Sequence, residues 1–565
     1  MTFIDKSIKL ALFTATFFLI SCSKEKFAEY NTNPDAVLSI APEPIFTKAI
    51  TNWHADSFDA FYDNYRGVSR WTRQFVGRLG NTGTITDGIG NLNARYGRFF
   101  LQSGNLLVDA QKTIDKMAPD QQARYVQFKA IAEIIKVYEA WYVTDANGSI
   151  PYSQAFQARY GGTLTPVYDT QQALYDTFDQ SLKAAVSTLK ATQPTPQAAL
   201  GNSDLYFGGN IPNWIKAATS LRFKIATRLI NVDQAKMKTI VNDILTNNIN
   251  DLMQSENDDW LLKAGSKFYD GSGNWDINAS GAYAANGTVD FMFRNKDPRL
   301  KMFYGENSWT QARFNQAKAE NKIPQSSVFD TRRYYGQYTS PDAATSTDVN
   351  IKNFFTSIVI GTGSTAVTLD TISPVQYKMF YPPFNGGTGT GTLVVLTYAD
   401  ICLLRAELAA RGITSENAQT LYNEGIRASI VTYDRIANAA KVDGYTALTG
   451  TAISDYLASP DIAYNSAKGV EQIVAQQYLN YYKDYNEAWA LLRRTNMPNE
   501  TTALKIEDFV VLGAKQAIPR RYVVNYPLAG DANFDNRQKA VADMVQIPYF
   551  GQPSDIKGRV WWDKP

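Results

Sequence analysis

Histidine and cysteine are the scarcest side chains in this sequence of 565 residues. There is one histidine, His54, and there are two cysteines, Cys22 and Cys402. Zinc sites built on several histidines and histidine-based catalytic triads need more than this chain offers. A strong charge of one sign is also missing, because 56 lysines and arginines face 54 aspartates and glutamates. The composition therefore argues against a multi-histidine zinc site, a histidine-based catalytic triad and a nucleic-acid partner. We also expect no catalytic site, no bound metal and no cofactor.

Long apolar runs are rare too, and one of them lies at the N-terminus. Residues 8–20 are almost wholly apolar and follow Lys6. This length suits a secretory signal and is too short to span a bilayer as a mature helix. The residues Leu19, Ile20 and Ser21 directly before Cys22 resemble a bacterial lipobox. That resemblance implies cleavage before Cys22 and attachment of lipid to it, whereas the alternative is an ordinary signal peptide with a chance cysteine.

This interpretation divides the chain into three parts. We expect a signal peptide over residues 1–21, a lipidated tether over 22–44 and a single domain over 45–565. An acylated Cys22 would leave Cys402 without a partner for an intramolecular disulfide. Because Cys402 lies in the apolar stretch "YADICLLRAELAARG", with no histidine nearby in sequence, we expect a buried and unreactive thiol.

Aromatic residues, by contrast, are abundant: 33 tyrosines, 29 phenylalanines and 10 tryptophans. Apolar side chains recur every three or four residues in several segments, which predicts amphipathic helices. Pairs of such helices, separated by loops, suggest tetratricopeptide-like packing, although no clean repeat of about 34 residues is visible. We therefore expect an all-α dominated fold with little β-structure. The predicted helices include residues 121–146, 169–190, 212–230, 398–411 and 470–494. Asp169 is the predicted N-cap of the second of these helices.

Two regions lack this periodicity. Residues 80–93, "GNTGTITDGIGNLN", cannot form a regular helix, and residues 255–395 are long, irregular and aromatic. Irregular stretches of this length are usually functional or disordered, and the aromatic content argues against disorder. We therefore expect functional loop-rich regions over about 255–395 and 67–93.

Sequence motifs in a fixed order now point to a family. The motifs are "FAEYNTNPDAV" (27–37), "NGSIPYSQAF" (147–156), "PVYDTQQALYDTF" (166–178), "DLYFGGNIPNWIKAATSLRFKIATRLI" (204–230), "NKDPRL" (295–300), "YADICLLRAELAARGI" (398–413), "LYNEGIRASI" (421–430), "QQYLNYYKDYNEAWALLRR" (476–494), "IPRRYVVNYPLAGDANFDN" (518–536) and "RVWWDKP" (559–565). With these motifs in this order, the chain resembles the SusD/RagB family of Bacteroidetes outer-membrane lipoproteins, in its SusD-like branch, over nearly its whole length.

The resemblance carries expectations about fold, partner and location. It implies a tetratricopeptide-type helical scaffold with a loop-rich second region. It also implies a non-catalytic surface protein of the outer membrane that acts as the lid of a SusC-like TonB-dependent transporter. Such a lid would hand oligosaccharides, or in some members peptides, to the barrel, and its lipid would hold it at the outer face of the cell.

Charged motif residues are expected to serve the architecture. Asp297 and Arg299 in "DPRL" predict a turn with a charge-assisted contact. Glu487 and Arg494 lie seven residues apart, two turns along one helix face. The pair Arg520 and Arg521 predicts forked contacts with carboxylates. Trp489 and Arg493 lie at helical spacing in the same motif as Glu487 and are also expected to have structural roles.

Ligand-binding residues can be proposed from the chemistry of sugars. A sugar ring offers an apolar face and a rim of hydroxyls, so its site needs an exposed aromatic platform and a few polar partners. Tryptophans in predicted helices or terminal motifs are assigned to the core, which leaves those in loops. By similarity to SusD-type proteins, whose sites draw on an early loop and the loop-rich middle, the platforms are Trp71, Trp275 and Trp309, and the polar partners are Arg73, Asn81, Asn274 and Asp276.

Four alternatives compete with this glycan-binding hypothesis. The same lid could carry peptides, or the chain could be a helical-repeat adaptor that binds only proteins. Each loop tryptophan could also be partly buried in the core of its loop and so not serve as an aromatic platform for a sugar. A hydrolase would need a carboxylate pair, and Asp258, Asp259 and Asp276 are candidates without a motif that fixes a pair. The stretch "SENDDW" (255–260) lacks the glycine turn and the spacing of about twelve residues of an EF-hand, so we expect a solvated acidic loop.

Overall fold

The computed structural model describes residues 40–81, 91–346, 357–524 and 527–565. Helices dominate and strands are short, so the predicted fold class is confirmed. The predicted signal peptide, Cys22 and most of the tether lie outside the described residues. Within the described part of the chain, no helix combines the length and the apolar character that crossing a bilayer requires.

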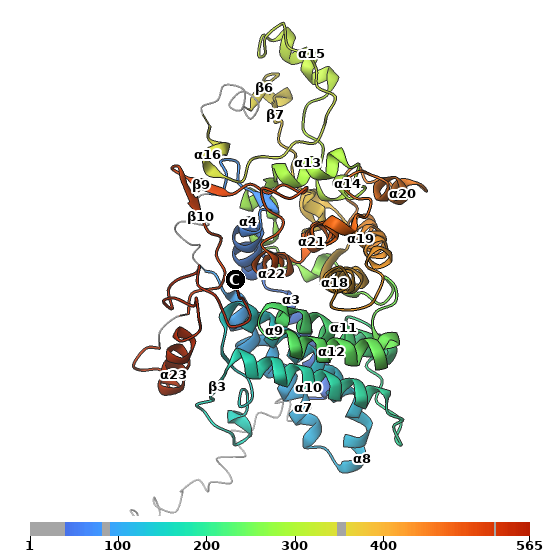
Figure 1. Ribbon diagram of the computed structural model, residues 1–565, viewed down its shortest axis with the longest axis vertical. Coiled ribbons are helices and arrows are strands. Elements are labelled where there is room, and N and C mark those ends of the chain that lie inside the picture. The colour runs from blue at the N-terminus through green and yellow to red at the C-terminus, as the bar shows by residue number, and fades with distance from the viewer. Residues whose placement is uncertain (1–39, 82–90, 347–356, 525–526) are drawn as a thin grey trace, which may run out of the picture.

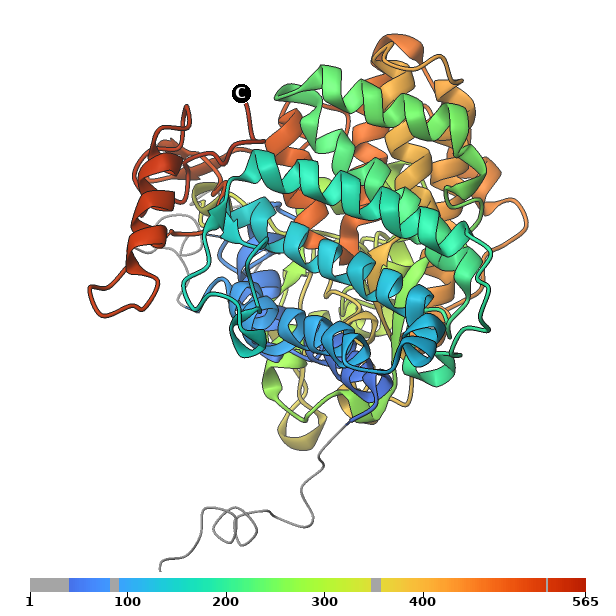
Figure 2. The ribbon, with the colours of Figure 1, turned by 90° about the horizontal axis from the view of Figure 1, so that it is seen from below.

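The N-terminal half forms a stack of helices in the lower part of Figure 1. Consecutive helices pack on one another, α9 on α10 and α10 on α11, while α3 and α7 pack together beside α9. Figure 2, seen from below, shows these blue-to-green helices side by side, with the red C-terminal segment that contains α23 at their edge. The helices are α3 (Pro42–His54), α7 (Gly104–Asp115), α8 (Pro119–Gln122), α9 (Val126–Asn147), α10 (Gln171–Lys190), α11 (Ile211–Thr227) and α12 (Gln234–Asn247).

Helix α10 shows how the sequence sets these elements. Its predicted apolar stripe, including Leu174 and Phe178, is buried in the stack. The N-cap, however, is Thr170, whose hydroxyl accepts from the amide of Ala173 at 3.3 Å. The predicted cap Asp169 is wrong, because its carboxylate instead accepts from the amides of Tyr152 and Ser153 and so ties the preceding turn to the helix.

A second helical group lies in the middle of Figure 1. Helix α18 packs on both α19 and α21, and its first turn is closed by a capping box between Thr397 and Asp400. Cys402 on α18 is a free, buried thiol whose pKa burial raises to about 12, as expected for an unreactive cysteine. The helices are α18 (Tyr398–Ala410), α19 (Ala418–Ala440), α20 (Ala452–Leu457), α21 (Gly469–Asn480) and α22 (Tyr485–Thr495).

The predicted loop-rich region occupies the upper part of Figure 1. Its longest strand pairing is antiparallel, β4 with β8, and it joins the two ends of this region. Many of its aromatic side chains share one hydrophobic core with the second helical group. The elements are β4 (Trp260–Ala264), β5 (Tyr283–Ala284), α13 (Asn286–Arg294), α14 (Leu300–Phe303), α15 (Gln311–Ala319), α16 (Pro341–Ala344), β6 (Ile358–Ile360), β7 (Val367–Leu369) and β8 (Gly391–Leu396).

Short elements join these groups. The π-helix η1 (Asp59–Val68) leads from the N-terminal stack into the early loop. The 3-10 turn η6 (Arg228–Asn231) extends α11, and the 3-10 turn η15 (Tyr481–Lys483) directly precedes α22. The remaining α-helices and strands of the described residues are α4 (Ser69–Trp71), β1 (Phe75–Val76), α6 (Ala94–Arg98), β2 (Ile150–Pro151), β3 (Tyr168–Asp169), β9 (Phe509–Val511), β10 (Ala514–Gln516) and α23 (Phe534–Val545).

Candidate ligand site

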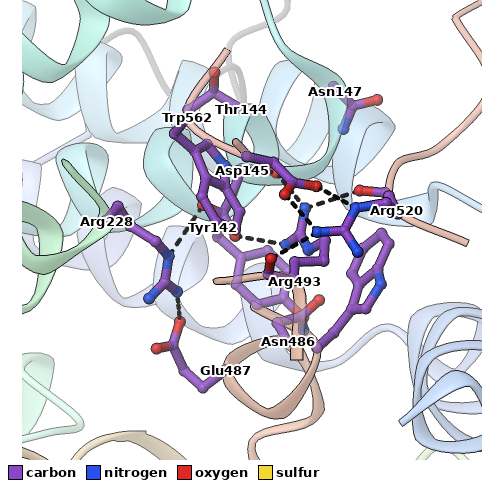
Figure 3. Close-up of polar contacts among 12 residues, drawn as sticks. Tyr142, Thr144, Asp145, Asn147, Arg228, Asn486, Glu487, Arg493, Arg520 and Trp562 are labelled. Carbon is purple, nitrogen blue, oxygen red and sulfur yellow. Dashed lines mark hydrogen bonds and ion pairs between the residues drawn. The ribbon is translucent and has the colours of Figure 1, made fainter. Parts of the chain in front are cut away.

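Motif residues form a buried ionic network between the two helical groups (Figure 3). Asp145, near the end of α9, accepts from Arg228 at 3.3 Å and from Arg493 of α22 at 3.0 Å. Arg228 also pairs with Glu487 on α22. Because all four side chains are buried, each charge depends on its partners, and the network fixes α22 against the N-terminal stack.

Two further sets of buried ionic contacts involve α18. Lys224 of α11 contacts Asp400 at 3.1 Å and Glu487 at 3.4 Å. Glu407 on α18 receives two hydrogen bonds from Arg494, one of them at 2.7 Å. The expectation that Glu487 and Arg494 have structural roles is confirmed. The two do not pair with each other, because Glu487 binds Lys224 and Arg228 whereas Arg494 binds Glu407.

The other predicted motif contacts are mostly confirmed. Arg299 donates to both carboxylate oxygens of Asp297, at 3.0 and 2.7 Å, in a fully buried pair. Arg520 makes the predicted fork with Asp563, at 2.8 and 2.5 Å. For Arg521 the prediction of a carboxylate partner is wrong, because its guanidinium donates to backbone carbonyls such as that of Pro553 at 2.9 Å.

Trp71 and Asn81 lie in the core rather than on the surface. Trp71 is 0% exposed, and its ring centroid lies 5.0 Å from that of Trp489. Asn81 is 1% exposed and accepts from the amide of Gly77 at 3.0 Å while donating to the carbonyl of Phe75 at 3.1 Å. The expected exposure is therefore wrong for both residues. Trp71 is covered because the early loop folds back onto the second helical group, and Asn81 is covered because its side-chain amide closes the turn between Phe75 and Gly77.

The loop around Trp275 is also packed inward. Trp275 is 3% exposed, and its indole N–H donates to Asp270 at 2.9 Å. Asn274 and Asp276 are half-buried, and Asp276 accepts from the amide of Asn278 at 2.9 Å to cap the next turn. An exposed platform is therefore wrong for Trp275, although its ring does line an internal cavity.

Trp309 lies elsewhere in the loop-rich region, just before α15. It is half-buried and packs against a small cluster that contains Ala317, Ile360 and Leu369. The seven predicted ligand residues are thus spread over three places, and the structure does not bring them together into one surface. Their role in ligand binding stays a prediction.

A cleft of about 460 Å³, here called the loop cleft, opens between the early loop and the loop-rich region. Its volume lies in the range of about 300–1,000 Å³ that is typical of ligand pockets. Two of its walls come from the regions predicted to hold the ligand, and the third comes from residues 500–507. The lining residues are Arg73, Ala285, Asn286, Gly287, Thr288, Asp290, Arg294, Tyr338, Thr339, Glu500, Lys505, Ile506 and Glu507.

Backbone geometry builds this cleft. Gly287, in the first turn of α13, lies so close to the chain at Lys505 that a β-carbon there would be 1.9 Å from the carbonyl oxygen. Only glycine allows this contact, which holds residues 500–507 against α13. Glu507 then accepts from the hydroxyl of Thr339 and the amide of Ser340, both at 2.9 Å, and joins the second and third walls.

Arg73 is the one predicted ligand residue in the loop cleft. It is 9% exposed, its guanidinium lies 4.7 Å from the ring centroid of Phe509, and its Nε has no hydrogen-bond partner among the described residues. Burial lowers the pKa of this guanidinium, and the nearby acids Asp508 and Glu507 oppose that shift. Arg73 therefore places a guanidinium, a group that donates to acceptor oxygens, in the wall of the loop cleft.

Sequence reasoning missed the remaining residues of the cleft. Tyr338, the one tyrosine in its lining, lies inside the predicted region 255–395, but nothing in the local pattern separates it from neighbouring tyrosines. Glu500, Lys505 and Glu507 fall outside that region altogether. Their alternation of charge in a polar stretch was the available signal, and it is also typical of an ordinary solvated loop.

The acidic residues considered for catalysis have structural partners. Asp258 contacts Lys216 at 2.8 Å. Asp259 accepts from the amide of Tyr398 at 2.7 Å and the hydroxyl of Thr432 at 2.8 Å. Burial raises the pKa of Asp259 to about 8. Among the described residues, no group of three potential metal ligands comes together.

Comparisons with known proteins agree on one family. The SusD-like model described as "starch-binding associating with outer membrane" matches residues 48–527. Among solved structures, a chitin-binding protein is 21% identical with a TM-score of 0.67, and a SusD homologue from Bacteroides fragilis NCTC 9343 is 23% identical with a TM-score of 0.61. Both alignments cover 93% of this chain and 100% of the other. A search of the curated proteins gives no match.

Proposed function

Because the chain belongs to the SusD-like family of starch-binding, outer-membrane-associated proteins, we propose that it is a non-catalytic surface protein that binds oligosaccharides in the loop cleft. The observation that carries this proposal is the cleft itself. It has the volume of a ligand pocket, and Arg73 of the predicted early loop is among the side chains that line it. A fold neighbour that is a chitin-binding protein supports a saccharide as the ligand.

We further propose the partner and the location that the family resemblance implies. The protein would act as the lid of a SusC-like TonB-dependent transporter and deliver its ligand to the barrel. Lipid on Cys22 would attach it to the outer membrane, with the cleft facing the exterior.

The binding proposal is tested by titrating the detergent-solubilised full-length protein with a panel of starch and chitin oligosaccharides. Arg73→Met should keep the packing over Phe509 but remove the donors, and Tyr338→Ala should remove a ring surface. A hydrogen bond to a charged group is worth about 1.5–3 kcal/mol, so Arg73→Met should weaken the best saccharide at least about tenfold. Isothermal calorimetry measures both affinities.

Arg159→Ala is the matched control, because Arg159 is exposed and lies outside the cleft lining. It should bind like the wild type. Unchanged affinity in both Arg73→Met and Tyr338→Ala would rule out the loop cleft as the saccharide site. An adaptor that binds only proteins would instead show no saccharide binding in the same titration.

Peptide cargo is the second candidate, and one observation favours it. The cleft carries both signs of charge, with Arg73, Arg294 and Lys505 near Asp290 and Glu507. These groups could pair with the two termini and the charged side chains of a peptide. Adding short peptides to the same titration panel distinguishes the two cargoes.

The two cysteines provide a direct test of the lipid anchor. Cys22→Ala should move the protein from the membrane fraction to the soluble fraction, because more than one acyl chain is needed for stable anchoring and the variant has none. Fractionation of cells followed by mass measurement of the mature protein checks this. Cys402→Ala is the control, since Cys402 is buried in α18, and it should stay on the membrane.

A further inference from the structure

Arg73 lies at a backbone position that is costly for arginine. Its φ is 63°, in the left-handed region that glycine adopts freely and that other residues adopt only at a cost. The residue lies just past α4, and its amide bonds to the carbonyl of Arg70 at 3.1 Å. A residue stays in such a conformation only where its surroundings enforce it, and such residues cluster at ligand sites.

The two neighbours of Arg73 enforce this conformation. The carbonyl of Thr72 accepts from the hydroxyl of Tyr478 at 2.9 Å. The side-chain amide of Gln74 donates to the carbonyl of Tyr481 at 3.0 Å. Both neighbours are buried, so the direction in which the Arg73 side chain leaves the backbone is fixed before any ligand arrives. A group that is already in place loses less freedom when it binds.

The guanidinium of Arg73 has donors that the protein does not use. It lies over the ring of Phe509, and no hydrogen bond or ion pair within the described residues engages its nitrogens. Only Nε among them is covered, so the two terminal nitrogens are the polar atoms with which the side chain lines the loop cleft. Two such nitrogens side by side match the two oxygens of a carboxylate or a similar oxyanion.

Lys505 is the second cation of the lining with unused donors. Its backbone is fixed by the close contact with Gly287, and its side chain is exposed. No hydrogen bond or ion pair in the described part of the chain engages its ammonium. Because an ammonium carries three donors, Lys505 is able to share the charge of a group that binds at Arg73.

The other charged side chains of the lining already have partners. Three cations and three acids line the loop cleft, so its formal charges cancel. Arg294, the third cation, contacts Asp290 at 3.3 Å. Glu507 accepts the two bonds described above, and Glu500 accepts from the amide of Asp508 at 2.8 Å. The free donors therefore belong to cations while the acids are engaged, which favours an anionic group over a cationic one.

We infer that Arg73 and Lys505 form an anion subsite in the loop cleft, and that the natural ligand carries a carboxylate or another oxyanion. The terminal nitrogens of Arg73 would donate to two oxygens of that group. Lys505 would donate from the wall that residues 500–507 form. The inference rests on the proposed function only in taking the loop cleft as the binding site, because the carboxylate could belong to an acidic sugar or to the C-terminus of a peptide.

Pairs of probes that differ only in charge test the subsite in the full-length protein. One pair is trigalacturonate and its methyl ester, and the other is N-acetyl-trialanine and its C-terminal amide. By calorimetry, at least one acid should bind about tenfold more tightly than its neutral partner, or better. This preference should vanish in Arg73→Gln and fall in Lys505→Gln. Arg159→Gln, which changes an exposed arginine outside the lining, should keep it.

A second measurement does not depend on the choice of cargo. Crystals are soaked with selenate, an oxyanion whose selenium is located by anomalous scattering. The ion should lie within hydrogen-bond reach of Arg73 in the wild type and should be missing in Arg73→Gln. If Arg73→Gln does not fold, Arg73→Gly carries both measurements, because glycine adopts the left-handed backbone without strain.

The outcomes separate this inference from the proposed function. Selective binding of the acidic peptide alone would support the anion subsite and contradict the saccharide proposal. Neutral starch or chitin oligosaccharides that bind in the loop cleft as tightly as the acidic probes would uphold the proposed function and overturn the subsite. A wild-type crystal without selenate at Arg73, or a preference for acids that survives in Arg73→Gln, would also overturn it.

Discussion

Replacing Glu407 with glutamine is expected to lower the free energy of unfolding by about 3–5 kcal/mol, the usual cost of breaking a buried ion pair. Glu407 is 1% exposed and is the carboxylate that binds Arg494. Its removal leaves that buried guanidinium without a counter-charge. Urea unfolding followed by circular dichroism measures the difference.

The same variant should show a defined pH dependence. Burial alone would raise the pKa of Glu407, but the charge and hydrogen bonds of Arg494 outweigh it and lower the pKa to about 2, from 4.5. The pair therefore contributes stability above about pH 4.5, and this contribution is lost as the pH falls toward 2. A shift of this size corresponds to roughly 3 kcal/mol, which is similar to the loss expected for the substitution. The difference between wild type and variant should be full at pH 7 and should shrink below pH 4.5.

Asp543→Asn is the matched control for this charge removal. Asp543 pairs with Lys539 at 2.6 Å on α23, but both side chains are exposed to solvent. Such a pair contributes little, so the loss should stay within about 0.5 kcal/mol. Equal effects of the two variants, or a Glu407 effect that does not depend on pH, would contradict the ionic network as a source of stability.

Trp71→Ala is the second change with a large expected effect, and the effect is on stability rather than on binding. The ring is fully buried against Trp489, and Tyr522 lies 6.0 Å from it between centroids. Removing a buried tryptophan costs about 3–5 kcal/mol, because both the burial and the contacts around the new cavity are lost. Thermal and urea unfolding should both show the loss.

Trp309→Ala provides the comparison. Trp309 is half-buried on a small separate cluster, so its loss should cost less than about 2 kcal/mol. Below the unfolding transition, Trp71→Ala should keep saccharide affinity better than Arg73→Met does. A Trp71→Ala protein of wild-type stability that has lost its ligand would instead support the original prediction of an exposed platform.

Periodicity predicted the helices because it reports one local property, the face that each helix buries. The stripe of α10 and the apolar run around Cys402 are buried as expected. Ends of elements were less certain, since Asp169 and Thr170 are both good N-cap residues and only the turn at Tyr152 decides between them.

Loop residues were predicted less well for a physical reason. Trp71 and Trp275 lie in segments without the apolar periodicity of a helix, and this lack of periodicity predicts a loop with an exposed side chain. The structure shows that the loops fold onto the second helical group and share its core. Arg73 does line the loop cleft. The wall of the cleft that residues 500–507 form, however, is more than 400 positions away from Arg73 in the sequence.

The sequence by itself determined the helical class, the family and the buried thiol on α18, because each depends on residues that are close together or on motifs in order. Only the tertiary structure decided which charges pair, which tryptophans are covered and where cavities open. Those properties depend on contacts between segments far apart in the chain, such as Glu407 with Arg494 or Gly287 with Lys505, and no local pattern records them.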